Sequence, residues 1–181
     1  MTCVIRPARP EEFAYLGEMT VQVYSRLDGM PTLEEQPDYY NRLRDVQARA
    51  SNPAIQVFAA VNAQHEQRRE QPRQHDLYGC VDFITDMQHY ASGGTAPTLP
   101  DSAGIRLLAV QPEFRKKGIG RALTEFCIQQ ARDLGRSQVI LHTTRAMGAA
   151  WRMYETMGFV RFPPIDFQQG RLEVFGFSLR L

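Results

Sequence analysis

The chain of 181 residues has little of what marks several classes of protein. Its three cysteines, Cys3, Cys80 and Cys127, are widely spaced and odd in number, which argues against a disulfide framework or a zinc site. No apolar run is long enough to span a bilayer, and the N-terminal residues lack the apolar core of a signal peptide. A formal net charge of +1 gives no general attraction for nucleic acid or anionic lipid. We therefore expect a cytoplasmic protein with no metal, nucleic-acid or membrane partner.

What is present is the composition of a globular protein, with 43% hydrophobic and 23% charged residues. Short apolar segments with strand character alternate with segments of helical periodicity. Strands are predicted at residues 4–5, 54–61, 77–84, 105–110, 138–142, 172–181 and from 159, and helices at 10–24, 37–50, 119–134 and 148–158. In the first part of the chain, neighbouring strands are expected to be mostly antiparallel. In the later part, strands and helices alternate. It predicts one α/β (α+β) domain over residues 1–181.

Two polar stretches interrupt this pattern. Residues 62–76 are expected to form an exposed connection or a mobile loop. Their Arg68–Arg69 pair would suit nucleic acid, but neighbouring glutamates and the lack of aromatic side chains argue against that function. Residues 85–104 contain glycine, serine and proline and are long enough for a lid or a disordered loop. The sequence is also compatible with a homodimer.

The most informative stretch is RKKGIGRA, at residues 115–122, between a predicted buried strand and a predicted helix. Amides at a helix start have no intrahelical partners, and the helix dipole favours an anion there. Gly118 and Gly120 would let a phosphate oxygen approach these amides. Positive charge at the rim would come from Arg115, Lys116 and Arg121. A tight turn with a solvated basic surface explains the same residues, so this stretch alone leaves both interpretations open.

Two common phosphate-binding motifs do not match. The nucleoside-triphosphate loop requires GxxxxGK followed by Ser or Thr, which is absent. The dinucleotide fingerprint requires a third glycine three residues after Gly120, where Leu123 stands. An anionic ligand other than ATP or NAD is favoured.

The stretch RKKGIG fits the (Arg/Gln)-x-x-Gly-x-(Gly/Ala) motif of the GNAT superfamily of acyl-CoA N-acyltransferases, and the resemblance is wider than this motif. Residues 108–135 resemble that family's strand, pyrophosphate loop and long helix, and residues 139–162 resemble its next strand, helix and strand. The second segment carries the family's signature residues Ala150, Tyr154, Glu155, Gly158 and Phe159. The resemblance implies a mixed, partly split β-sheet flanked by helices on both faces.

The resemblance also implies a cosubstrate, acetyl-CoA, and no metal. The pyrophosphate would bind the amides of residues 115–120, and the pantetheine arm would run along the strand that ends at Val110. The implied cofactor-binding residues are Leu108, Ala109, Val110, Arg115, Lys116, Lys117, Gly118, Ile119, Gly120 and Arg121. Many members carry Asn where this chain has Met147, so one polar contact to the pantetheine is in doubt.

Direct acyl transfer needs an acid and a base. Tyr154 matches the family's general acid, and a phenol of pKa about 10 can protonate a thiolate whose conjugate acid has a pKa of about 8.5. Asp82 is the candidate base, because it is a carboxylate within an otherwise apolar strand, where a charged group is unexpected unless it has a function. Near predicted strand ends stand the alternatives Asp86, His89 and His142. The family often uses water relays, so a missing base would not exclude the activity.

The acceptor is implied to enter over the first two helices, their loop at residues 25–36, and the segment after the third strand. These regions offer apolar and aromatic side chains: Tyr24, Met30, Tyr39, Tyr40, His89 and Tyr90. No acidic cluster indicates a polyamine, and Asp166 is a lone carboxylate that suits a turn cap better than an amine. Trp151 is expected to pack in or beside the core rather than contact adenine or the acyl group. Cys127 lies on the apolar face of a helix and is not expected to be a nucleophile.

The sequence thus favours an N-acetyltransferase that transfers an acetyl group from acetyl-CoA to a primary amine of a small molecule or peptide. The alternative is a catalytically weak, acyl-CoA-binding regulatory module. Tyr154 and the loop glycines argue for the enzyme.

Overall fold

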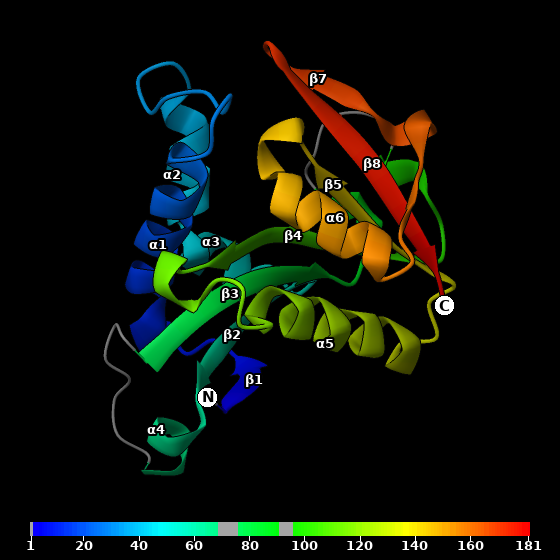
Figure 1. Ribbon diagram of the computed structural model, residues 1–181. Coiled ribbons are helices and arrows are strands. Elements are labelled where there is room, and N and C mark those ends of the chain that lie inside the picture. The colour runs from blue at the N-terminus through cyan, green and yellow to red at the C-terminus, as the bar shows by residue number, and fades with distance from the viewer. Residues whose placement is uncertain (1, 69–75, 91–95) are drawn as a thin grey trace.

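The computed structural model describes residues 2–68, 76–90 and 96–181 (Figure 1). The strands of these residues form one eight-stranded sheet in the order β1-β2-β3-β4-β5-β8-β6, with β7 paired to β8. β4 and β5 are parallel, and the other pairs are antiparallel. The strands are β1 (Cys3–Pro7), β2 (Ile55–Asn62), β3 (Leu77–Ile84), β4 (Ser102–Val110), β5 (Gln138–Thr143), β6 (Val160–Arg161), β7 (Phe167–Gln169) and β8 (Leu172–Arg180).

The helices cover both faces of this sheet. They are α1 (Phe13–Ser25), α2 (Pro37–Arg44), α3 (Val46–Ala50), α4 (Ala63–Arg68), α5 (Ile119–Asp133) and α6 (Gly148–Thr156). Figure 1 shows α1, α2 and α3 on one face, with α5 and α6 on the other. Across the three described ranges, none of the helices has the length and apolar character needed to span a bilayer. The predicted mixed, partly split sheet with helices on both faces is confirmed.

Each face of the sheet has its own core. Leu123 and Cys127 of α5 pack on one face with Phe83, and Leu16 of α1 packs on the other with Val57. Every residue of β3 is buried, as expected for a central strand covered on both sides. Burial of a leucine such as Leu16 or Leu123 stabilises the fold by about 1.5–3 kcal/mol. These two cores fix the sheet on which the site is built.

The sheet opens in its middle, where β4 and β5 stop pairing. Residues 102–105 of β4 pair with residues 138–141 of β5, and beyond Ile105 the two strands have no paired residues. β4 carries a bulge opposite β3, and Leu107 has a φ of 51°. A bulge increases local twist and bends the strand that carries it. The end of β4 therefore has a free edge, at residues 106–110, that faces the opening.

Several predicted elements are confirmed and others are corrected. β3 has the predicted bounds, and Gly135, with a φ of 67°, follows the end of α5 as predicted. The helix predicted at 37–50 is wrong as one element, because Asp45 has a non-helical ψ of 73° and its side chain accepts a hydrogen bond from the Ala48 amide. It is α2 followed by α3. The three-residue β7 was not predicted.

The two polar stretches also differ in part from expectation. Residues 63–68 form α4 rather than a loop, while Arg69 and the rest of 69–75 lie outside the described residues. In the second stretch, β4 begins at Ser102, three residues before the predicted start. Tyr90 is buried and its hydroxyl lies 3.0 Å from His142 Nδ1. Residues 91–95 of this stretch lie outside the described residues.

Candidate active site

The glycine loop, residues 115–121, joins the end of β4 to the start of α5. Gly118 is the N-cap of α5 with a φ of 82°, a conformation that favours glycine. The first amide of the helix with a backbone acceptor is that of Ala122, 2.9 Å from the Gly118 carbonyl. Within the described ranges, the amides of residues 119–121 donate to no backbone carbonyl. Three unpartnered amides at the positive end of a helix are suited to bind an anion.

Packing inside the protein does not explain the second glycine of this loop. A Cβ added at Gly120 would lie 3.6 Å from Met153 Sδ and 3.7 Å from Val110 Cγ2, which are ordinary contacts. Gly120 has a helical conformation, in which alanine is preferred by about 1 kcal/mol. The small residue instead leaves room above the amides. An approaching ligand group is the physical reason for such a residue.

The cations of the glycine loop are exposed. Arg115 Nε donates to the Val110 carbonyl at 3.3 Å, and Lys117 Nζ lies 5.3 Å from the centre of the Phe114 ring. Arg121 forms an ion pair of 3.2 Å with Glu125, one turn further along α5. Arg115 and Lys117 of this loop therefore have no carboxylate partner among the described residues. Their charge adds to that of the helix terminus.

The predicted residues on β4 lie where the strand borders the opening. Leu108 and Val110 pack against the α5 side, whereas Ala109 is buried on the α1 side opposite Cys80. The Tyr24 hydroxyl of α1 donates to the Leu108 carbonyl over a long 3.4 Å. The free edge of the strand leads from the glycine loop into the opening between β4 and β5. The structure thus brings the predicted cofactor-binding residues 108–110 and 115–121 together.

Tyr154 lies on α6 and is buried in the core on the α5 side of the sheet. Its ring packs edge-on against Phe159 at 5.7 Å. Burial raises the pKa of the Tyr154 phenol, and Tyr90 and Cys127 raise it further, so the phenol carries its proton at neutral pH. Its hydroxyl has no hydrogen-bond partner in the described part of the chain. The proton is therefore not committed to another group of the protein.

An inner hollow of about 90 Å³ lies in the opening between β4 and β5. Tyr24, Met30, Tyr39 and Tyr90 line it, as the resemblance implied for the acceptor side, whereas Tyr40 is buried with its hydroxyl on the Pro31 carbonyl. Its other side chains include His142, Thr143, Thr144, Met147 and Phe167. Thr143 and Thr144 are 1% and 3% exposed, and among the described residues neither hydroxyl has a hydrogen-bond partner. Buried hydroxyls normally form hydrogen bonds, and a bound ligand would supply the missing partners.

His142 and Tyr90 form a neutral pair in the inner hollow. His142 Nε2 lies 2.9 Å from the Ile165 carbonyl, so this nitrogen carries the proton and Nδ1 accepts from the Tyr90 hydroxyl at 3.0 Å. Burial lowers the pKa of His142, and the Ile165 carbonyl partly offsets this. The pair places a neutral imidazole and a phenol on the wall of the hollow.

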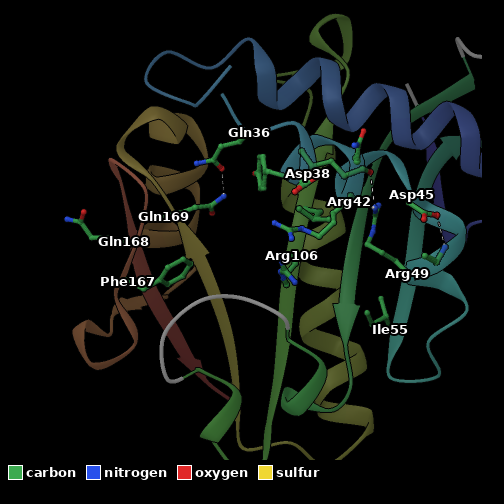
Figure 2. Close-up of a pocket in the computed structure, with 15 residues that line it drawn as sticks. Gln36, Asp38, Arg42, Asp45, Arg49, Ile55, Arg106, Phe167, Gln168 and Gln169 are labelled. Carbon is green, nitrogen blue, oxygen red and sulfur yellow. Dashed lines mark hydrogen bonds between the residues drawn. The ribbon is translucent and has the colours of Figure 1, made fainter. Parts of the chain in front are cut away.

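An outer groove of about 860 Å³ continues from the inner hollow between α2, α3, β4 and β7 (Figure 2). Tyr39, Arg106, Leu107, Phe167 and Gln169 line both spaces, so they mark where the two meet. Its charged side chains are Asp38, Arg42, Asp45, Arg49 and Arg106. The groove has the size of a small-molecule site, which is typically about 300–1,000 Å³.

Asp82 lines neither space, but it supports the wall of the outer groove. Its carboxylate is 2% exposed and forms an ion pair of 2.7 Å with Arg49. Arg49 Nη1 also donates to the carbonyls of Arg42 and Leu43, at the end of α2. Burial raises the pKa of Asp82, and the charge of Arg49 partly offsets this. The role of Asp82 as a base stays a prediction.

The other residues considered from the sequence have structural partners. Asp86 accepts from the Gln88 amide, His89 Nδ1 lies 3.0 Å from Asn52 Nδ2, and Asp166 pairs with Arg161 at 2.6 Å. Trp151 packs against Phe175 and Phe177. Cys127 is fully buried, and burial raises its pKa. No cluster of His, Cys, Asp or Glu suited to a metal is found within residues 2–68, 76–90 and 96–181.

Sequence reasoning missed Arg106, the adjacent Thr143 and Thr144 at the end of β5, and the β7 residues of the groove. Arg106 had a signal, because it is the single charge within the apolar run 105–110. Phe167 and Gln169 had no such signal, since they belong to a three-residue strand that is too short to show a periodic pattern. Gln169 reaches the groove wall by a hydrogen bond of 2.9 Å to Gln36, which is far away in the sequence.

Comparison with known proteins agrees with this geometry. Mycothiol acetyltransferase from Thermobispora bispora is 41% identical over 58 residues, which is 32% of this chain and 20% of that protein. The chain thus spans about a fifth of the length of this curated relative.

Two solved structures share the fold. An acetyltransferase of the GNAT family from Staphylococcus aureus aligns with a TM-score of 0.70 at 15% identity, covering 99% of both chains. The PaiA N-acetyltransferase from Thermoplasma acidophilum, in complex with coenzyme A, aligns with a TM-score of 0.67 at 16% identity, covering 97% of this chain and 98% of that one. The model of the Acetyltransferase (GNAT) family matches residues 31–159, and the chain belongs to this family.

Proposed function

We propose that the protein is an N-acetyltransferase that transfers an acetyl group from acetyl-CoA to a primary amine by direct attack. The observation that carries this proposal is the row of unpartnered amides at residues 119–121, above which Gly120 leaves space. Membership of the family supports the same activity.

The glycine loop fits the pyrophosphate of acetyl-CoA. Its amides would donate to the phosphate oxygens, and Arg115 and Lys117 would supply countercharge. The pantetheine arm would extend along the free edge of β4, at residues 108–110, and pair with it as an added strand does. This path leads the thioester into the opening beside Tyr154.

The transfer forms a bond between the amine nitrogen and the acetyl carbon and breaks the bond between that carbon and sulfur. An amide of β4 would stabilise the oxyanion of the tetrahedral intermediate. Tyr154 would give its proton to the leaving thiolate, because its hydroxyl is otherwise unpartnered. We assign the proton lost by the amine to Asp82. Because the Asp82 carboxyl lines neither the inner hollow nor the outer groove, the proton would have to reach it through water.

Calorimetric titration with acetyl-CoA tests the glycine loop, with dephospho-CoA and ATP as comparators. We expect saturable binding of acetyl-CoA that Gly120→Glu reduces more than about 100-fold, because a carboxylate would stand where the phosphates bind. Gly120→Ala is the matched control, since its Cβ makes only ordinary contacts. A folded protein that does not bind acetyl-CoA would show that the loop is a basic turn and not a cosubstrate site.

Release of free coenzyme thiol in the presence of primary amines then tests turnover. An acetyl group found on the amine, with an equal amount of coenzyme A, supports the enzyme. Tight acetyl-CoA binding with no transfer to any amine would instead identify an acyl-CoA-binding regulatory module.

A further inference from the structure

The charged side chains of the outer groove differ in whether they have a hydrogen-bond or ion-pair partner among the described residues. Asp45 accepts from the Ala48 amide, and Arg49 is paired with Asp82. Asp38 lies one helical turn before Arg42 on α2, and neither has an ion-pair partner within the described residues. Both are exposed at the mouth of the groove. The remaining charge is Arg106, which lies deeper.

Arg106 is half-buried at the junction of the outer groove and the inner hollow. Its Nη1 donates to the Tyr90 carbonyl, and its guanidinium carbon lies 5.4 Å from the centre of the Tyr90 ring. No carboxylate of the described residues lies within ion-pair distance of it. Among the described residues, the only hydrogen bond of this half-buried guanidinium is the one to Tyr90, so it is suited to a planar, bidentate anion such as a carboxylate.

The field of Arg106 reaches both spaces. Burial raises the pKa of Tyr39 and of Tyr90, and in each case Arg106 opposes that rise. Burial lowers the pKa of His142, and Arg106 lowers it further. Arg106 also opposes the rise in the pKa of Asp82, its neighbour on β3, so the buried carboxylate offsets part of this positive charge.

The inner hollow offers complementary groups. The hydroxyls of Thr143 and Thr144 are buried and have no hydrogen-bond partner in the part of the chain that the structure describes, and each can accept a hydrogen bond from an N–H group. Figure 2 shows the side chains of Arg42 and Arg106 extending toward the middle of the groove, between α2 and β7. An anion at Arg106 would thus lie between the solvent-exposed groove and a small hollow lined by acceptors.

We propose that the acceptor is an amine that also carries a carboxylate, and that Arg106 binds this carboxylate while the amine enters the inner hollow. The inference rests on the proposed function. Arg42, at the mouth, assists by long-range attraction. Two sources share this chemistry: a free amino acid with its α-carboxylate, and a peptide whose first residue is acidic. A polyamine, which has no anionic group, would place a cation beside Arg106.

The first test uses the unmodified protein and matched acceptors. Thiol release from acetyl-CoA is measured with the proteinogenic L-amino acids and with their α-carboxamides. We expect kcat/KM to be about 10- to 100-fold higher for acids than for amides, as for the loss of a hydrogen-bonded ion pair. Dipeptide amides that begin with Glu or with Gln distinguish the second source. Equal rates for acid and amide in both series would overturn the inference and leave the enzyme intact.

Variants then assign the preference to one side chain. Arg106→Gln should remove the preference for the carboxylate and leave acetyl-CoA affinity unchanged, and Arg106→Lys should retain part of it. Arg44→Gln is the matched control, because Arg44 is on α2 but pairs with Glu18 outside the groove. A preference that persists in a folded Arg106→Gln protein would overturn the assignment.

Failure of the proposed function would be separately visible. If no amine is acetylated, the coenzyme A complex is titrated with N-acetyl-L-amino acids and with their amides. Binding that requires both the carboxylate and Arg106 would support the carboxylate site while contradicting the transferase. Equal binding of acid and amide, or no binding of either, would overturn the carboxylate site.

Discussion

The glycine loop and the outer groove are built in opposite ways. The loop is one continuous segment whose working groups are backbone amides, at residues 119–121. The groove is assembled from α2, α3, β4 and β7, and its working groups are side chains. Backbone amides are present in every sequence, so a loop needs only the right turn and small residues. Side chains differ from chain to chain, so the groove is where one member of a fold family differs from another.

If the glycine loop binds acetyl-CoA and the outer groove binds the acceptor, as proposed, Tyr154 should affect the chemistry that joins them. Tyr154→Phe is expected to lower kcat about 10²- to 10⁴-fold, because the leaving thiolate loses its proton donor. Acetyl-CoA affinity should stay the same in calorimetry. Tyr15→Phe, which removes a phenol outside both hollows, is the control. An unchanged kcat in Tyr154→Phe would remove the assigned acid.

Asp82→Asn tests whether the groove wall depends on the ion pair with Arg49. We expect the free energy of unfolding to fall by about 3–5 kcal/mol, because Arg49 is left buried without its partner charge. Denaturant unfolding measures this. The same change at the half-exposed Asp166 should cost about 1 kcal/mol or less.

The same variant tests the assigned base. If Asp82 receives the amine proton, the folded fraction of Asp82→Asn should show a lower kcat and an altered pH–rate profile. Full kcat with only the stability lost would limit Asp82 to supporting the wall.

Gly104→Ala would alter the proposed acceptor side from within β4. The added Cβ would lie 2.5 Å from Cδ2 and 2.6 Å from Cε2 of Tyr90, so the ring must move. We expect unfolding free energy to fall by about 1–3 kcal/mol and KM for the amine to rise, with acetyl-CoA affinity retained. Gly148→Ala, whose Cβ would meet nothing closer than 3.7 Å, is the control for stability. Loss of acetyl-CoA affinity in Gly104→Ala would show that the two regions are not separable.

The smallest expected effect is a pH dependence from His142. Burial lowers its pKa in the folded state, so the unfolded state binds the proton more readily. The stability that comes from keeping His142 neutral is present above its unfolded pKa of about 6.5 and is lost as the pH falls below that value. The slope is at most about 1.4 kcal/mol per pH unit. Urea unfolding at several pH values should show a shallower slope in His142→Asn, and an identical slope would exclude this source.

The sequence predicted the elements that are continuous segments, and it did not predict the groove, which is assembled from distant segments. The strand at residues 77–84 and the helix after Gly118 were predicted correctly, because each is a continuous pattern with clear turn residues at its ends. The break at Asp45 was missed, since its side chain caps α3 inside a pattern that is helical throughout. Arg106 and Gln169 meet only after the chain has folded, so no local pattern indicates that they border one groove.

The bulge at Leu107 places two consecutive side chains of β4 on the same face. Ile105 packs on the α5 side, while Arg106 and Leu107 both face the acceptor side, and Leu108 returns to the α5 side. One extra residue thus shifts the parity of the strand. Deletion of Leu107 would restore strict alternation and leave Ile105, Arg106 and residues 108–110 on the faces that they now occupy. The extra residue therefore supplies a bend: without it β4 would keep the same side chains on each face but would lose the local twist where it parts from β5.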